Sequence, residues 1–248
     1  MTSFEKQPKI AAIIAAYNEA EYLGRVLGVL RQVDVLNEIL VINDGSQDAT
    51  EIVALQATER DERIRLLRHP TNRGKGQAIY TGRENTRAGI LLLLDADLLE
   101  LKPSQVRSLI QPVLKGEADM TLGLFRGGRL NTDLAHWATP WLSGQRCLRN
   151  ELLDMVSRPA AQGYGLETAI TVAALLNGWK TQPVWLEGVY HPDGETHRGF
   201  VRGLFNRVSM YAQIIRAWYV AGGLQSLDML YRRNRTRVKK PVIDRTYQ

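Results

Sequence analysis

Residues 91–97 read Leu91-Leu92-Leu93-Leu94-Asp95-Ala96-Asp97, an apolar run that ends on two carboxylates. A short apolar run bounded by polar residues is typical of a buried strand. Side chains alternate along a strand, so Asp95 and Asp97 would point the same way if the strand geometry persisted. Two carboxylates that converge at the carboxyl edge of a parallel sheet suit a hard divalent cation and a diphosphate.

The first 125 residues alternate strand and helix patterns around this run. Apolar runs predict strands at residues 9–15, 38–42, 64–68, 90–94 and 118–124. Helical spacing predicts helices at residues 19–31, from Asp48 or Thr50 to 60, at 76–86 and at 103–115. Four crossovers of this length indicate an α/β fold with a mostly parallel sheet flanked by helices, whose ligands lie at its carboxyl edge.

The regular alternation of strand and helix patterns ends after residue 125. We expect helices at residues 148–155 and 167–177, a strand at 181–186 and an amphipathic helix at 200–219. That last helix is either a core helix or one that lies on a membrane surface. The two regions are expected to share one fold.

The composition is that of an ordinary soluble globular protein, with 44% hydrophobic and 23% charged residues in 248. The single cysteine, Cys147, excludes an intramolecular disulfide and a cysteine metal cage, and we interpret it as a packing residue. No run approaches the ~20 apolar residues of a membrane span. The apolar residues 10–16 are interpreted as a first strand and not as a signal peptide, which favours a cytoplasmic location.

The net charge is +6, and basic residues crowd the end of the chain. Residues 226–248 are interpreted as a basic tail, which is either solvated or in peripheral contact with the anionic inner face of a membrane. No motif with interleaved aromatic residues accompanies the tail, so a nucleic-acid partner is not expected.

Four polar segments follow four successive predicted strands. They are Ala15-Ala16-Tyr17-Asn18-Glu19, Asn43-Asp44-Gly45-Ser46-Gln47-Asp48, Asn72-Arg73-Gly74-Lys75-Gly76 and Asp95-Ala96-Asp97. In this order and spacing the chain resembles the nucleotide-diphospho-sugar glycosyltransferases of the GT-A fold, especially family 2. It departs from that pattern at Ala15, where proline is common, and at Asn43, where aspartate is common.

The resemblance implies roles for these residues. Those expected to hold the donor are Ala16, Tyr17, Glu19, Asp44, Lys75, Asp95 and Ala96. Glu19 would contact the ribose hydroxyls, and Asp44 would accept a hydrogen bond from the base, which does not distinguish uracil from guanine. Lys75 would lie near the diphosphate or the base. Asp97 would ligate Mg²⁺ or Mn²⁺, which neutralises the departing nucleoside diphosphate.

The second half carries a weaker resemblance, to glucosyl-3-phosphoglycerate synthases and related short bacterial transferases. It rests on the segments Leu142-Ser143-Gly144-Gln145-Arg146, Gly163-Tyr164-Gly165-Leu166-Glu167 and Gly188-Val189-Tyr190-His191. The resemblance implies that His191 is a metal ligand, with His197 as the second candidate. Glu167 either orients or deprotonates an acceptor hydroxyl as a catalytic residue, or only favours the start of its helix.

Four arginines flank this acceptor region and suit a phosphate or carboxylate group. They are Arg126, Arg129, Arg146 and Arg149. Five tryptophans, Trp137 and Trp141 among them, leave a homodimer open.

The expected function is that of a metal-dependent glycosyltransferase. Residues 1–125 would form the nucleotide-sugar-binding half and residues 126–225 the acceptor-binding half of one GT-A domain. The enzyme would move a hexose from UDP- or GDP-hexose, such as UDP-glucose, to a small anionic acceptor such as 3-phosphoglycerate. The alternatives are a polyprenyl-phosphate sugar synthase at the membrane surface, a non-catalytic nucleotide-sugar-binding protein and, with less support, a nucleotidyltransferase.

Overall fold

The computed structural model describes residues 8–127, 143–156, 158, 161, 165–192, 216 and 218–222. In this part of the chain one seven-stranded sheet has the order β3-β2-β1-β4-β6-β5-β7. The strands are β1 (Ile10–Ala16), β2 (Glu38–Asp44), β3 (Ile64–His69), β4 (Ile90–Asp95), β5 (Met120–Arg126), β6 (Arg146–Arg149) and β7 (Thr181–Glu187). All neighbours are parallel except those of β6, so the expected mostly parallel sheet is confirmed.

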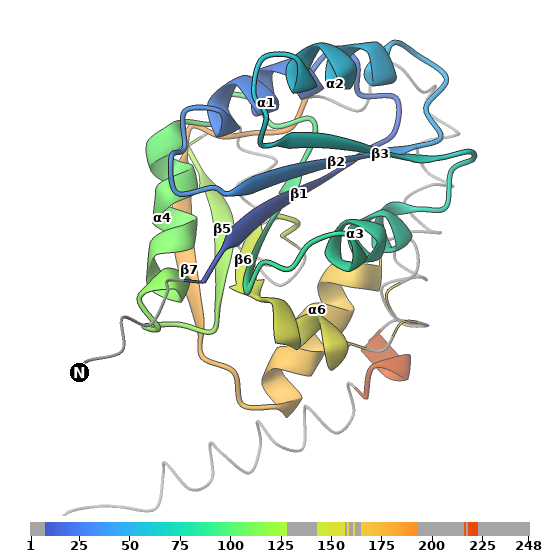
Figure 1. Ribbon diagram of the computed structural model, residues 1–248. Helices are drawn as coiled ribbons and strands as arrows, with labels where there is room; N and C mark the ends of the chain where they lie inside the picture. Colours follow the sequence, from blue (N-terminus) through green and yellow to red (C-terminus); the bar gives the residue numbers. More distant parts are fainter. Residues whose placement is uncertain are drawn as a thin grey trace, which may run out of the picture.

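Helices cover both faces of the sheet (Figure 1). Their bounds are α1 (Leu23–Leu30), α2 (Thr50–Thr58), α3 (Lys75–Glu84), α4 (Pro103–Leu114) and α6 (Leu166–Leu176), and a short 3₁₀-helix spans Asn150–Asp154. Buried side chains of α1, α2 and α4 join one core layer, and those of α3 and α6 join the other. The amphipathic spacing seen in the sequence therefore corresponds to two apolar layers, one on each face.

Side chains alternate between the two faces of the sheet along β4, and this alternation determines the face on which Asp95 lies. Leu92 and Leu94 lie in the layer under α1 and α4, whereas Leu91 and Leu93 lie in the layer under α3 and α6. Burial of each such leucine contributes about 2 kcal/mol. Asp95 continues the register of Leu91 and Leu93, so its side chain lies on the face that carries α3 and α6.

The strand β6 was not predicted, and the helix predicted at residues 148–155 is wrong. Residues 146–149 form an antiparallel strand between β4 and β5, and the 3₁₀-helix follows at once. Cys147 and Leu148 are fully buried there. A four-residue strand has no periodicity to detect, because distant neighbours and not local spacing determine its conformation.

The remaining predictions for the second half fall partly outside the described residues. Those that lie outside are His197, Arg129, Trp137, Trp141, Gly163, Tyr164 and the tail at residues 226–248. Of the helix predicted at residues 200–219 the structure describes Arg216, Trp218 and Tyr219, which are helical. Among the described helices, none combines the length and the apolar character that crossing a membrane requires.

Candidate active site

Four neighbouring parallel strands bring their polar ends to one edge of the sheet. β1, β2, β3 and β4 end at Ala16, Asp44, His69 and Asp95 and pair with one another in register. The four polar segments found in the sequence therefore meet at the carboxyl edge, where parallel α/β sheets bind their ligands.

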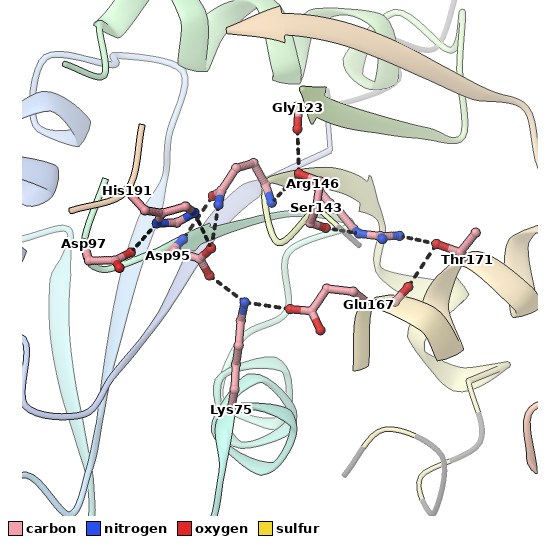
Figure 2. A network of polar contacts seen from close by, with 10 residues as sticks. Lys75, Asp95, Asp97, Gly123, Ser143, Arg146, Glu167, Thr171 and His191 are labelled. Carbon is pink, nitrogen blue, oxygen red and sulfur yellow. Dashed lines mark hydrogen bonds and ion pairs between the residues drawn. The ribbon is translucent and has the colours of Figure 1, made fainter. Parts of the chain in front are cut away.

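Asp95, Asp97 and His191 form a cluster at this edge (Figure 2). The imidazole Nδ1 of His191 lies 2.9 Å from Oδ1 of Asp97, and its Nε2 lies 3.6 Å from Oδ2 of Asp95. One ligand atom from each residue falls within 4.8 Å of the others. Two carboxylates and an imidazole match the preferences of a divalent cation such as Mn²⁺, so these residues fit the expected metal site.

Main-chain contacts place His191 beside Asp97. Leu99 and Tyr190 exchange two backbone hydrogen bonds, of 3.0 and 3.3 Å, just after Asp97 and just before His191. Phe125 packs against the imidazole, with 5.2 Å between ring centroids. Burial would lower the pKa of His191, but the hydrogen bond and the charges of Asp97 and Asp95 raise it above 6.5.

Lys75 joins the two halves of the site. As the first residue of α3, it lies 2.5 Å from Oδ1 of Asp95 and 2.6 Å from Oε1 of Glu167 in the first turn of α6. Burial alone would lower the pKa of Lys75, but the two carboxylates raise it above 10.5. Burial would raise the pKa of Asp95, but mainly the charges of Lys75 and His191 lower it to about 2. Lys75 and Asp95 are therefore both charged near neutral pH.

Asp44, the last residue of β2, holds the loop before α3. Its Oδ1 accepts the amide of Arg73 at 2.9 Å and faces Nδ1 of His69 at 2.6 Å, and its Oδ2 accepts the amide of Gly74 at 2.8 Å. Thr81 contacts the other ring nitrogen of His69 at 2.9 Å. A carboxylate offers about four acceptor positions, so about one remains for the predicted contact of Asp44 with a base.

Hydrogen bonds connect the loop after β1 to the loop after β2. The amides of Asn18 and Glu19 donate to the hydroxyls of Ser46 and Thr50 at 3.0 and 2.8 Å. Asn18 has a φ of 57°, a left-handed conformation that asparagine tolerates. Burial and then the charges of Asp97, Asp95 and Asp48 raise the pKa of Glu19 to about 7. Tyr17, two residues earlier in the same loop, has 39% of its surface exposed.

Asn43 has a structural reason to differ from aspartate. Its Nδ2 donates to Oε2 of Glu51 at 3.1 Å, and its Oδ1 accepts the amide of Ser46 at 3.0 Å. An aspartate would keep the second contact but would set a carboxylate against Glu51. The departure at Asn43 therefore suits this chain's own α2.

Of the arginines expected near the acceptor, Arg146 is buried close to Lys75 and Glu167, and Arg149 lies elsewhere. Arg146 is 0% exposed, and it donates to the carbonyl of Ser143 at 2.8 Å and to Oγ1 of Thr171 at 3.0 Å. Because β6 runs antiparallel, Arg149 pairs with Ile90 at the opposite, amino edge of the sheet. Arg126 ends β5, with its guanidinium 5.7 Å from the ring centroid of Trp185.

Sequence reasoning gave no role to Gly144, Gln145 or His69, which contact the expected site residues. Gln145 bonds Asp95 at 2.6 Å and His69 bonds Asp44 at 2.6 Å. A methyl group on Gly144 would lie 2.7 Å from both Nζ of Lys75 and Oδ2 of Asp95. Each contact joins residues that are distant in sequence, so local patterns could not indicate it. Gly144 and Gln145 entered the sequence analysis only as part of the segment at residues 142–146.

Glu19 should make the metal-free protein less stable as the pH rises. Its folded-state pKa of about 7 exceeds the ordinary 4.5, so the folded chain binds this proton more tightly than the unfolded chain. The stability it contributes is present below 4.5 and lost as the pH rises through about 7. Urea unfolding with a chelator at about pH 5 and about pH 8 should show a smaller decrease for Glu19→Gln than for the wild type. Equal decreases would contradict this account.

The sheet order and the site define a protein of the GT-A class. Residues 11–176 match the family described as Glycosyl transferase family 2. That segment is more than half of the chain and includes Glu19, Asp44, Lys75, Asp97 and Glu167. The chain belongs to glycosyl transferase family 2.

Two of the relatives have names that state an activity. The chain is 38% identical over 108 residues to a dolichyl-phosphate beta-glucosyltransferase of Trichomonas vaginalis, covering 39% of this chain and 32% of that protein. It is 27% identical over 193 residues to glucosyl-3-phosphoglycerate synthase of Mycolicibacterium smegmatis, covering 66% and 63%. The chain thus spans less than two thirds of the length of either relative.

One solved structure shares most of the fold. It is glucosyl-3-phosphoglycerate synthase of Mycobacterium tuberculosis in complex with Mn²⁺, uridine-diphosphate-glucose and phosphoglyceric acid. The TM-score is 0.69 at 25% sequence identity, over 87% of this chain and 80% of that one.

Proposed function

We propose that this chain is a metal-dependent glycosyltransferase that moves glucose from UDP-glucose to a small anionic hydroxyl acceptor such as 3-phosphoglycerate. The main support for this proposal is the cluster of Asp95, Asp97 and His191. It lies next to the ion pairs of Lys75 with Asp95 and Glu167. Relatives that act on glucosyl groups support the sugar, and the UDP-glucose complex of the solved synthase supports the base.

On this proposal Asp97 and His191 hold a divalent cation, and Asp95 contributes an oxygen or contacts the donor. The bound cation would act as a Lewis acid that neutralises the departing nucleoside diphosphate. Lys75 adds a positive charge at the same edge, where the diphosphate would lie. Glu19, Tyr17, Ala16, Asp44 and Ala96 would contact the nucleoside from the loops after β1, β2 and β4.

Glu167 is proposed to serve the acceptor. Its carboxylate is 2.6 Å from Lys75 and faces the same edge from α6 (Figure 2). An ionised carboxylate accepts hydrogen bonds only, so it can orient an acceptor hydroxyl and take its proton. In the transfer, the bond from the anomeric carbon to the diphosphate breaks and a bond to the acceptor oxygen forms. The proton leaves that oxygen, and UDP carries away the electron pair.

Turnover with defined substrates tests the proposal. The full chain, with 3-phosphoglycerate, Mn²⁺ or Mg²⁺ and one of four donors, should release nucleoside diphosphate. The donors are the glucose and mannose conjugates of UDP and GDP. We expect the largest rate with UDP-glucose, with a product that mass spectrometry identifies as the acceptor plus one hexose. Full activity in excess chelator would overturn the metal role, and binding of the donor without transfer would favour a non-catalytic protein.

A second acceptor class has support from one comparison. The similarity to a dolichyl-phosphate beta-glucosyltransferase covers 39% of this chain, so a polyprenyl phosphate is the alternative acceptor. The same assay with a polyprenyl phosphate in detergent distinguishes the two. Transfer to the lipid but not to 3-phosphoglycerate would replace the first acceptor by the second.

A further inference from the structure

The side-chain amide of Gln145 makes two hydrogen bonds to Asp95. Gln145 is 1% exposed, its Nε2 donates to Oδ2 of Asp95 at 2.6 Å, and its Oε1 accepts the backbone N–H of Asp95 at 3.1 Å. Only one orientation of the amide satisfies both bonds, because a flipped amide would set its oxygen against the carboxylate. Gln145 therefore ties the carboxylate of Asp95 to the main chain of the same residue.

With these two bonds in place, the two carboxylate oxygens of Asp95 face different partners. Oδ1 of Asp95 lies 2.5 Å from Nζ of Lys75, whereas Oδ2 lies 3.6 Å from Nε2 of His191. Figure 2 shows Asp95 between these two partners. Without the amide, attraction by Lys75 would draw both oxygens to one side. With it, Oδ2 stays directed toward His191 and the neighbouring Asp97.

Gln145 is itself held by the adjoining strand. Its carbonyl accepts the amide of Gly123 in β5 at 2.8 Å, and its amide donates to Oγ of Ser143 at 3.2 Å. Ser143 in turn donates to the carbonyl of Gly123 at 2.5 Å. A methyl group on Gly123 would lie 2.9 Å from Cβ of Gln145, so glycine is needed for this approach.

We propose that Gln145 is a positioning residue, which aims one oxygen of Asp95 at Asp97 and His191 and so sets how tightly this cluster binds a divalent cation together with a nucleoside diphosphate. The inference rests on the proposed function. It adds a residue that lies outside the four donor motifs: Gln145, from the segment before β6, would position Asp95 for the metal site.

The test compares binding by folded variants of the full chain. Gln145→Met has a similar shape but makes neither hydrogen bond, and Gln145→Glu keeps the acceptor for the N–H but faces the carboxylate with another carboxylate. Calorimetry with Mn²⁺ alone and with UDP plus Mn²⁺ should show at least ~10-fold weaker binding for Gln145→Met, because hydrogen bonds to charged groups are the strong ones. Gln145→Glu should bind UDP plus Mn²⁺ no better than Gln145→Met.

A control separates positioning from general damage. Gln182→Met makes the same exchange at an exposed position on β7. It should bind within ~3-fold of the wild type. Affinities for Gln145→Met and Gln145→Glu within ~2-fold of the wild type would overturn the inference alone, as would an equal loss in Gln182→Met. If Gln145→Met is unfolded by circular dichroism, Gln145→Glu decides in the same way. A wild type that binds neither Mn²⁺ nor UDP would overturn the proposed function and this inference with it.

Discussion

Replacing Asp97 with asparagine should weaken Mn²⁺ binding at least ~100-fold and remove the metal-dependent part of UDP binding. Asparagine keeps the shape of the side chain and a carbonyl oxygen for His191, but it lacks the negative charge that holds a cation. The contact that it alters most directly is the 2.9 Å contact with Nδ1 of His191. Calorimetry of Mn²⁺ and of UDP with and without Mn²⁺ measures both effects.

The same substitution should hardly change stability. Without metal, Asp97 repels the carboxylates of Asp95 and Glu19, and this repulsion contributes to the raised pKa of Glu19. Removing one charge offsets the weaker bond to His191, so the free energy of unfolding should stay within about 1 kcal/mol. Asp34→Asn is the matched control, since Asp34 is an exposed partner of Arg107 outside the site. Asp97→Asn with unchanged Mn²⁺ affinity would place the metal elsewhere.

Replacing Gly144 with alanine should damage the site far more than the fold. The new methyl group would lie 2.7 Å from Nζ of Lys75 and from Oδ2 of Asp95, closer than a carbon can approach. Nζ ends the flexible side chain of Lys75 and can move away, which relieves the overlap by separating the ion pair with Asp95. We expect at least ~30-fold weaker binding of UDP plus Mn²⁺, with a stability loss of only about 1–2 kcal/mol.

A second glycine gives the control for this prediction. An alanine methyl at Gly28 in α1 would meet nothing within 4 Å, and alanine favours a helix interior by about 1 kcal/mol. Gly28→Ala should therefore raise the urea midpoint and leave binding unchanged. If Gly144→Ala bound UDP plus Mn²⁺ like the wild type, the close approach of segment 143–145 to the ion pair would be irrelevant to the site.

The first half of the fold could be predicted because its signals are local. Each apolar run and each helical spacing up to residue 126 matches an observed element to within a few residues, apart from the start of α1 at Leu23. The run before Asp95 alternates between two apolar layers as a buried central strand must. Local pattern was sufficient there because each helix returns the chain to the same sheet, where the next strand runs in the same direction.

The second half was predicted less well because its contacts are distant in sequence. The antiparallel strand β6 consists of four residues that lie between β4 and β5, and the residues that it pairs with are more than 20 positions away in sequence. The insertion of β6 explains why Arg149 lies at the amino edge of the sheet, away from the site, and why Arg146 is buried. The structure does bring His191 to Asp95 and Asp97, as the resemblance implied, but the roles of these residues stay predictions.

The paired hydrogen bonds between Leu99 and Tyr190 give the site an unusual freedom for redesign. They fasten two stretches of main chain immediately beside Asp97 and His191, and they use no side-chain atom. The spacing of these two positions therefore does not depend on which residues occupy them. An engineer could exchange aspartate, histidine or glutamate there to select among cations of different softness, while the underlying scaffold keeps its register.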